Sequence, residues 1–192
     1  MRLFIAVDLD QEIKHRVLAV QDRIRKEVNH GKFPEKENFH ITLVFLGETP
    51  EERLPVIKEV IKQAASKSGK PVPAFELSFS RAGFFKRGAR ELWWLGADTK
   101  NYQLESLHKN LTSELLARNF IFDSKPFTAH ITLGREIRGG LWPFETENIT
   151  VPVKRLSLMQ SRHIQAAGKK TTVAYTELFG YDFGSQDNRI IN

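Results

Sequence analysis

The stretch Phe39-His40-Ile41-Thr42-Leu43 recurs almost unchanged, ninety positions later, as Ala129-His130-Ile131-Thr132-Leu133. The chain of 192 residues contains six histidines, and two of them therefore share one four-residue context. Composition alone should produce such a repeat in fewer than about one in 10^4 chains. The repeat predicts two copies of one structural unit, each with a histidine at the same place.

Each copy is expected to form a β-strand whose two faces differ chemically. The first copy is rich in β-branched and aromatic residues and is followed by Gly47, which is typical of a strand that ends in a turn. Residues two apart on a strand point to the same face. His40 and Thr42 therefore share one face and the aliphatic Ile41 and Leu43 share the other. We expect the aliphatic face to pack in the core.

Hydrophobic periodicity predicts that each copy closes a strand–helix–strand unit, so that two similar lobes place the repeats symmetrically across a cleft. The expected elements are a strand at Arg2–Val7, a helix from Asp10 to about Asn29, a helix beginning at the capping box Thr49-Pro50-Glu51-Glu52, strands at Ala74–Ser80 and Leu92–Ala97, a helix lined by Leu104, Leu107, Leu111 and Leu115, and strands at Val153–Gln160 and Thr171–Leu178. We expect one bilobal domain over residues 1–183 and a frayed polar tail over residues 184–192.

Composition narrows the class of protein. A hydrophobic content of 41% with 27% charged residues is ordinary for a globular protein, and the absence of cysteine excludes disulfides, thiolate nucleophiles and cysteine-bound metals. The apolar run Leu3–Val7 is too short for a signal peptide, and no stretch is long enough to span a membrane. We therefore expect a cytoplasmic protein. The net charge of +6 favours polyanionic partners.

A pair of histidines is suited to phosphodiester chemistry. Displacement at phosphorus needs one group to take a proton from the attacking oxygen and another to protonate the departing oxygen, and imidazole does both near neutral pH. The hydroxyls of Thr42 and Thr132 can donate to the non-bridging phosphate oxygens. His40 and His130 are therefore the candidate catalytic pair.

Two other interpretations are weaker. Each repeat offers one imidazole and a threonine, whereas zinc sites use three or four protein ligands, so no metal and no cofactor are expected. The histidines of the repeats would alternatively be polar residues of a half-exposed sheet, but the duplication argues against this. The remaining histidines lack such a context. We expect surface positions for His15, His30 and His108, whereas His163 lies in a basic loop that is either a phosphate contact or a solvated charge cluster.

The paired motifs resemble those of the two-histidine (2H) phosphoesterase superfamily. Within it, the chain is similar to the RNA 2′,3′-cyclic phosphodiesterases, also called LigT-like 2′-5′ RNA ligases. The matching segments are Arg2-Leu3-Phe4-Ile5-Ala6-Val7-Asp8, the stretch from His40 to Glu48, the stretch from Phe127 to Arg135, and the late strands around Leu156-Ser157-Leu158 and Tyr175. The resemblance covers nearly the whole chain. It implies an α+β, bilobal pseudo-two-fold fold, with two antiparallel sheets facing a central cleft and helices packed outside.

The resemblance also implies an activity and two further contacts. The implied reaction is metal-independent hydrolysis of RNA or nucleoside 2′,3′-cyclic phosphate ends to 2′-phosphates, with reversible 2′-5′ RNA ligation in some relatives. By motif position His40 and His130 are the acid–base pair; we assign His40 as the base and His130 as the acid, although the pseudo-symmetry also permits the reverse. We expect the protein to be a monomer. In relatives, the aromatic residue and the arginine five positions after each histidine contact the nucleotide; here these are Phe45 and Arg135. An offset of five should point away from the cleft, so a bulge, for Arg135 at Gly134, must intervene. For Phe45 a core position is the alternative.

Alternative functions remain open at this point. One is a phosphodiesterase for another small nucleotide, such as 2′-5′ oligoadenylate or a cyclic ADP-ribose phosphate. The other is a module that binds RNA ends without turning them over. The second is disfavoured because binding alone needs no pair of proton-transfer groups.

Overall fold

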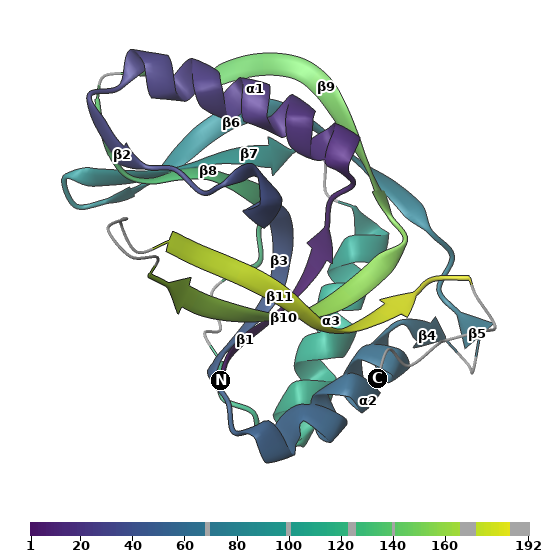
Figure 1. Ribbon diagram of the computed structural model, residues 1–192. Helices are drawn as coiled ribbons and strands as arrows, with labels where there is room; N and C mark the ends of the chain where they lie inside the picture. The colour runs from purple at the N-terminus through teal and green to yellow at the C-terminus, as the bar shows by residue number, and fades with distance from the viewer. Residues whose placement is uncertain (68–69, 99–100, 123–125, 140, 166–171, 185–192) are drawn as a thin grey trace.

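The computed structural model describes residues 1–192 except residues 68–69, 99–100, 123–125, 140, 166–171 and 185–192 (Figure 1). In chain order the elements are β1 (Arg2–Asp8), α1 (Gln11–Glu27), β2 (His30–Lys32), the 3₁₀ turn η1 (Lys36–Asn38), β3 (His40–Glu48), the 3₁₀ turn η2 (Glu51–Arg53), α2 (Leu54–Ala64), β4 (Ser66–Lys67), β5 (Lys70–Pro71), β6 (Phe75–Arg87), β7 (Arg90–Ala97), α3 (Tyr102–Ala117), β8 (His130–Arg138), β9 (Phe144–Val153), β10 (Arg155–Ile164) and β11 (Thr172–Asp182). The predicted tail lies outside the described residues except for Gly184.

The two predicted sheets are joined into one. Within the described residues the strands form a nine-stranded sheet in the order β11-β10-β1-β3-β8-β7-β6-β9, with β2 paired to β8. We call β11, β10, β1 and β3 the first half-sheet, and β8, β7, β6 and β9 the second half-sheet. The halves meet where β3 pairs with β8 in antiparallel register, at Ile41 opposite Ile131. The two repeats are thus the central neighbours of a single antiparallel sheet.

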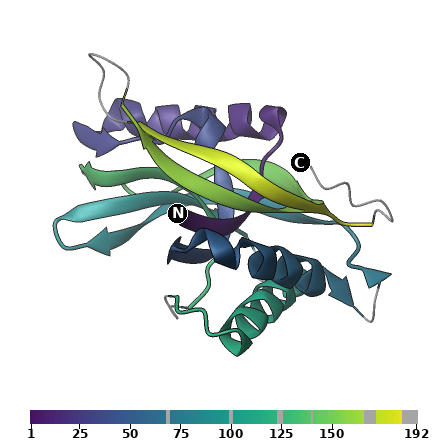
Figure 2. The same ribbon diagram turned by 60° about the horizontal axis from the view of Figure 1, so that its bottom comes forward.

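The helices cross from one half to the other. Helix α1 follows β1 of the first half-sheet, yet it packs against β8 and β9 of the second. Helix α3 follows β7 of the second half-sheet and packs against β3 and α2. Figures 1 and 2 show α1 at one end of the molecule and α2 with α3 at the opposite end, with strands between them. The predicted strand–helix–strand units are therefore not separate lobes, because each helix covers the half-sheet to which the other repeat belongs.

One continuous core supports both halves. Ile41 and Ile131, the pair at the junction, are fully buried. They belong to the same hydrophobic cluster as Val17 and Ile24 of α1, and Ile57 of α2 also lies in it. The aliphatic face of each repeat packs in this core, as the strand alternation predicted. Burial of that face is the main force that fixes the opposite face, which carries the histidines.

Two predicted boundaries are wrong. The segment Val153–Gln160 was expected to be one strand, but the chain turns at Lys154 between β9 and β10. Strand β9 was missed because it lies at an edge of the sheet, where most side chains of Phe144–Asn148 are at least partly exposed and Pro152 is tolerated. The capping box also does not form: η2 precedes α2, and the Thr49 hydroxyl donates to the Gly47 carbonyl.

Candidate active site

The two histidines of the repeats are oriented by the same hydrogen bond to a backbone carbonyl. His40 Nδ1 lies 2.7 Å from the Asn38 carbonyl oxygen, and His130 Nδ1 lies 2.7 Å from the Thr128 carbonyl oxygen. A carbonyl can only accept a hydrogen bond, so each Nδ1 carries the proton in the neutral ring. Each Nε2 is thereby left as the proton-accepting atom. The repeat fixes the tautomer and orientation of both rings through the carbonyl two residues earlier.

Both imidazoles lie on one face of the sheet. Residues paired across antiparallel strands point to the same side, and Ile41 and Ile131 point into the core. Their neighbours on each strand therefore point to the opposite side. We call this side, which carries His40, Thr42, His130 and Thr132, the histidine face. All four of these side chains are partly buried.

Thr42 contacts the reactive nitrogen of His40. Its Oγ1 lies 2.9 Å from His40 Nε2, and because that nitrogen is an acceptor, the hydroxyl donates to it. Thr132 occupies the equivalent place on β8, where its Cα partner on β7 is Trp94. The threonine hydroxyls are therefore on the histidine face beside the imidazoles, where a phosphate oxygen would compete for the hydroxyl of Thr42.

A bulge in β3 brings Phe45 to the histidine face. The pairing with β1 shifts so that Thr42 is opposite Ala6 and Val44 opposite Ile5, which leaves Leu43 as the additional residue. Leu43 and Val44 are both buried, whereas Phe45 is 44% exposed. The structure thus rules out the core position that the sequence left open for Phe45. The guanidinium of Arg2 lies 5.1 Å above its ring.

The second repeat has the matching bulge. Thr132 is opposite Trp94 and Gly134 is opposite Trp93, so that Leu133 is additional. A Cβ at Gly134 would lie 2.5 Å from the Cδ1 atom of buried Ile137, so this position faces the core. Arg135 then returns to the histidine face and is exposed. The expectation of a bulge beside Gly134 is confirmed.

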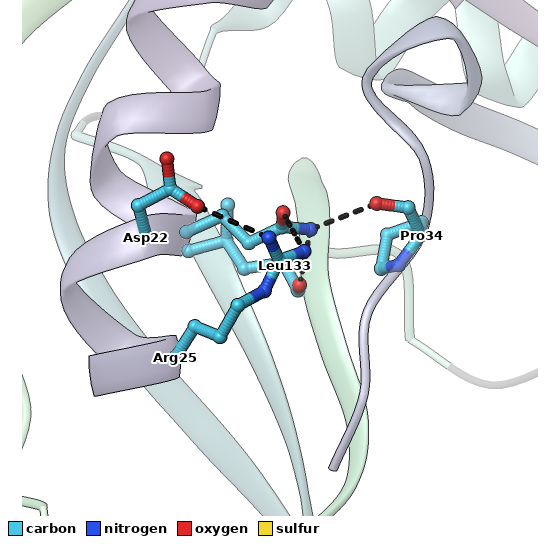
Figure 3. Close-up of polar contacts among 5 residues, drawn as sticks. Asp22, Arg25, Pro34 and Leu133 are labelled. Atoms are coloured by element: carbon cyan, nitrogen blue, oxygen red, sulfur yellow. Dashed lines mark hydrogen bonds and ion pairs between the residues drawn. The ribbon is translucent and has the colours of Figure 1, made fainter. Parts of the chain in front are cut away.

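A buried glutamine supports this second bulge, and sequence reasoning missed it. Gln21 of α1 is fully buried, and its Nε2 donates to the Leu133 carbonyl at 2.9 Å and to the Pro34 carbonyl at 3.0 Å (Figure 3). Its Oε1 accepts from Arg25 Nη2 at 2.9 Å. The amide is satisfied on both ends and ties α1 to the bulged residue of β8. A polar residue on the apolar stripe of a predicted helix was the available signal.

A buried lysine supports the first repeat in a similar way. Lys14 of α1 is 4% exposed, and its Nζ donates to the Glu37 carbonyl at 3.0 Å. The same Nζ lies 2.8 Å from the carboxylate of Asp8, whose Cα partner is His40. The ammonium group therefore connects β1 to the η1 turn that supplies the Asn38 carbonyl for the His40 ring.

Aromatic residues flank both histidines, and the sequence did not assign them to the site. The centroid of the His40 ring lies 4.8 Å from that of Phe4 and 5.1 Å from that of Tyr175. The centroid of the His130 ring lies 5.8 Å from that of Phe85, which meets it edge-on. These residues come from β1, β11 and β6, so only the sheet order brings them to the repeats.

Burial dominates the electrostatics of the site. It lowers the pKa of His40 from 6.5 to about 4, partly offset by the Asn38 carbonyl and the carboxylate of Asp8. Burial also lowers the pKa of His130, partly offset by the Thr128 carbonyl. The positive charge of Arg135 lowers the pKa of both rings, and that of His130 lowers the pKa of His40. Arg135 is thus close enough to both imidazoles to make the space between them attractive to an anion.

The other described histidines lie outside this arrangement. His15 is exposed and bonds to the Gln11 carbonyl, and His30 is exposed on β2. His108 is half-buried and stacks on Phe127, so its predicted surface position is wrong. His163 is exposed at the end of β10, and residues 166–170 of its loop lie outside the described residues.

Two kinds of feature are absent from the described residues. The part of the chain that the structure describes contains no group of three or more His, Cys, Asp or Glu side chains placed to hold a metal ion. Among the helices of that part, none has both the length and the apolar composition needed to cross a membrane.

A bent antiparallel sheet with two His-x-Thr strands on one face defines the class of two-histidine phosphoesterases. The sequence model of the LigT-like phosphoesterases matches residues 7–93. The RNA 2′,3′-cyclic phosphodiesterase of Thermotoga maritima is 32% identical over 136 residues, which make up 70% of this chain and 70% of that protein. The protein of the same name from Archaeoglobus fulgidus is 35% identical over 136 residues, 70% of this chain and 72% of that protein. The chain belongs to the LigT-like phosphoesterase family.

The structural comparison agrees over almost the full length. The crystal structure of Escherichia coli LigT complexed with 3′-AMP superposes with a TM-score of 0.80 and 26% sequence identity. The match covers 96% of this chain and 98% of that one. The predicted family and α+β fold are therefore confirmed.

Proposed function

We propose that the protein hydrolyses RNA or nucleoside 2′,3′-cyclic phosphates to 2′-phosphates with His40 and His130 as its acid–base pair. The observation that carries the proposal is the matched orientation of the two rings, each with Nδ1 on a backbone carbonyl and Nε2 available on one shared face. Relatives that are 30–35% identical carry the name RNA 2′,3′-cyclic phosphodiesterase. A module that only binds RNA ends has no need for two imidazoles with this matched orientation.

The lowered pKa of His40 supports its assignment as the base. A histidine with a pKa of about 4 is neutral at pH 7, so His40 can take a proton from the attacking water. The water oxygen bonds to phosphorus, the bond from phosphorus to the ribose 3′ oxygen breaks, and His130 donates its proton to that oxygen. If the 5′-hydroxyl of a second RNA replaces water, the same step forms a 2′-5′ linkage.

The remaining residues of the site bind the phosphate. We assign Thr42 and Thr132 to its non-bridging oxygens and Arg135 to its negative charge. Arrival of the phosphate draws the Thr42 hydroxyl away from His40 Nε2, which frees that nitrogen for catalysis. Phe45 is assigned to a contact with the nucleotide. We propose no metal ion or cofactor, and we further propose a cytoplasmic monomer, in keeping with the absence of cysteine.

The direct test is product analysis with purified protein in EDTA. We expect 2′,3′-cyclic AMP and an RNA oligonucleotide with a cyclic phosphate end to be converted to 2′-phosphates, at the same rate with and without the chelator. Loss of activity in EDTA that one added metal restores would contradict the metal-free mechanism. Turnover of 2′-5′ oligoadenylate or of a cyclic ADP-ribose phosphate, but not of cyclic phosphates, would favour the other substrates.

The pH dependence of kcat/KM should be bell-shaped. Activity needs a neutral His40, so it should fall as the pH drops through about 4. It also needs a protonated His130, whose pKa is lowered from 6.5, so activity should fall as the pH rises through a value below 6.5. The two limbs belong to the coupled pair. The expected maximum lies between these limbs, and a kcat/KM that keeps rising above pH 6.5 would contradict the assigned roles.

A further inference from the structure

We propose that Phe85 and Trp94 form the binding site for the nucleobase of the nucleotide that carries the cyclic phosphate. We call these two residues the aromatic pair. The inference rests on the proposed function and deepens it, because it places one end of the substrate on the second half-sheet. It also defines which part of the substrate the protein recognises besides phosphate.

Trp94 lies across the backbone of β6 and β7 on the histidine face. It is the Cα partner of Gly83 on β6 and of Thr132 on β8. A Cβ at Gly83 would lie 2.6 Å from Trp94 Cη2, and a Cβ at Gly96 would lie 2.6 Å from Trp94 Cζ3. Only glycine at both positions lets the indole pack directly onto the sheet. The half-buried indole therefore forms a flat apolar surface beside Thr132 of the second repeat.

Phe85 contacts both the indole of Trp94 and the imidazole of His130. Its ring centroid lies 5.3 Å from that of Trp94, at an interplanar angle of 41°. Its centroid also lies 5.8 Å from that of His130, at an interplanar angle of 89°. Phe85 is 38% exposed although its ring contacts that of His130. An apolar surface adjacent to His130 is thus available to a ligand.

The reaction geometry places the base on this side. His130 donates its proton to the ribose 3′ oxygen, so the ribose must lie within hydrogen-bond reach of His130. The base extends from the same ribose and must lie near the same half-sheet. An unstacked base binds well against aromatic side chains, and Phe85 of the aromatic pair is an exposed ring in contact with the His130 ring.

The described aromatic rings of the first half-sheet near His40 differ from this surface: Phe4 is buried and Tyr175 is half-buried, while the exposed Phe45 has the guanidinium of Arg2 5.1 Å above its ring. Phe4 is 3% exposed and packs with Ala6, Met159 and Tyr175 in a small cluster of its own. The rings next to His40 therefore mainly cover the imidazole and lower its pKa by burial. Phe85, in contact with His130, is more exposed than Phe4 in contact with His40, and this difference between the two halves of the site supports placing the base on the second half-sheet.

The test compares two substrates of the wild-type protein and its variants. One is 2′,3′-cyclic AMP and the other is methyl ribofuranoside 2′,3′-cyclic phosphate, which keeps the ribose and the cyclic phosphate but has no base. Stacking of one base on an aromatic side chain contributes about 1–3 kcal/mol. We expect Phe85→Ala to lower kcat/KM for cyclic AMP about 10-fold, mainly through KM, and to leave the base-free substrate unchanged within about 2-fold.

Two variants complete the test. Trp94→Leu should reproduce the substrate-selective loss; the indole Nε1 has no hydrogen-bond partner among the described residues, so the change removes no described hydrogen bond. Tyr102→Ala is the matched control, because Tyr102 is an exposed aromatic residue on α3. An equal loss for both substrates in Phe85→Ala, or a loss of base preference in Phe45→Ala alone, would overturn the inference. If the wild-type protein opens neither substrate, the proposed function itself fails.

Discussion

Replacing His40 or His130 by alanine is expected to lower kcat for 2′,3′-cyclic AMP by about 100-fold or more. In the proposed mechanism each imidazole transfers a proton in the transition state, and one general acid or base contributes about 10^2- to 10^4-fold. The kcat of the double variant should be only slightly lower than that of the less active single variant, because the two groups act in one concerted step. Single-turnover kinetics of the purified variants measure the loss directly.

The same variants distinguish a catalytic from a structural role. Both side chains lie on the histidine face, outside the main core cluster, so we expect the free energy of unfolding at pH 7 to change by less than about 2 kcal/mol. His15→Ala, which alters an exposed histidine of α1, should match the wild-type protein in both activity and stability. If His40→Ala or His130→Ala lowered the free energy of unfolding by more than about 2 kcal/mol, together with the loss of activity, the histidines would have a structural role in the sheet.

Acidification is expected to destabilise the folded protein through His40 by roughly 3 kcal/mol between pH 7 and pH 4. The unfolded chain binds a proton at this residue near pH 6.5, whereas the folded protein binds it only near pH 4. Across that window the unfolded state holds more protons, so stability falls as the pH falls. Below about pH 4 both states are protonated and the contribution of His40 levels off.

Urea unfolding of the wild-type protein and of His40→Asn at pH 7 and pH 4 tests this expectation. The variant has no titrating ring at this position, so it should lose roughly 3 kcal/mol less stability than the wild-type protein over the same interval. His15→Asn serves as the control and should follow the wild-type protein. Equal losses for all three proteins would show that His40 is not buried as the structure has it.

The sequence was sufficient for the local structure of the repeats. Alternation of polar and aliphatic residues in His40–Leu43 and His130–Leu133 placed both histidines and both threonines on one face, and the structure has them there. Strand β1 and helix α1 were also predicted correctly in outline. These features depend on backbone sterics and on the period of a strand or a helix, which a few neighbouring residues determine.

Pairing between distant strands was harder to predict. The bulges that turn Phe45 and Arg135 toward the histidine face arise from the register of β3 on β1 and of β8 on β7. The offset of five residues indicated that some irregularity was needed, but the sequence could not show that both repeats contain it. Strand β9 was missed for a related reason, because an edge strand with polar residues lacks a clear apolar pattern.

The sequence by itself determined which residues we propose for the chemistry, namely two histidines and two threonines at equal spacing in two equivalent strands. Only the tertiary structure decided how these residues behave. It paired Ile41 with Ile131, crossed α1 over to the second half-sheet, packed His40 against Phe4 and Tyr175, and left Phe85 exposed beside His130. The physical reason is that orientation along a strand is a local property of the backbone, whereas burial, pKa and access to substrate depend on residues that are distant in sequence and meet only when the sheet closes.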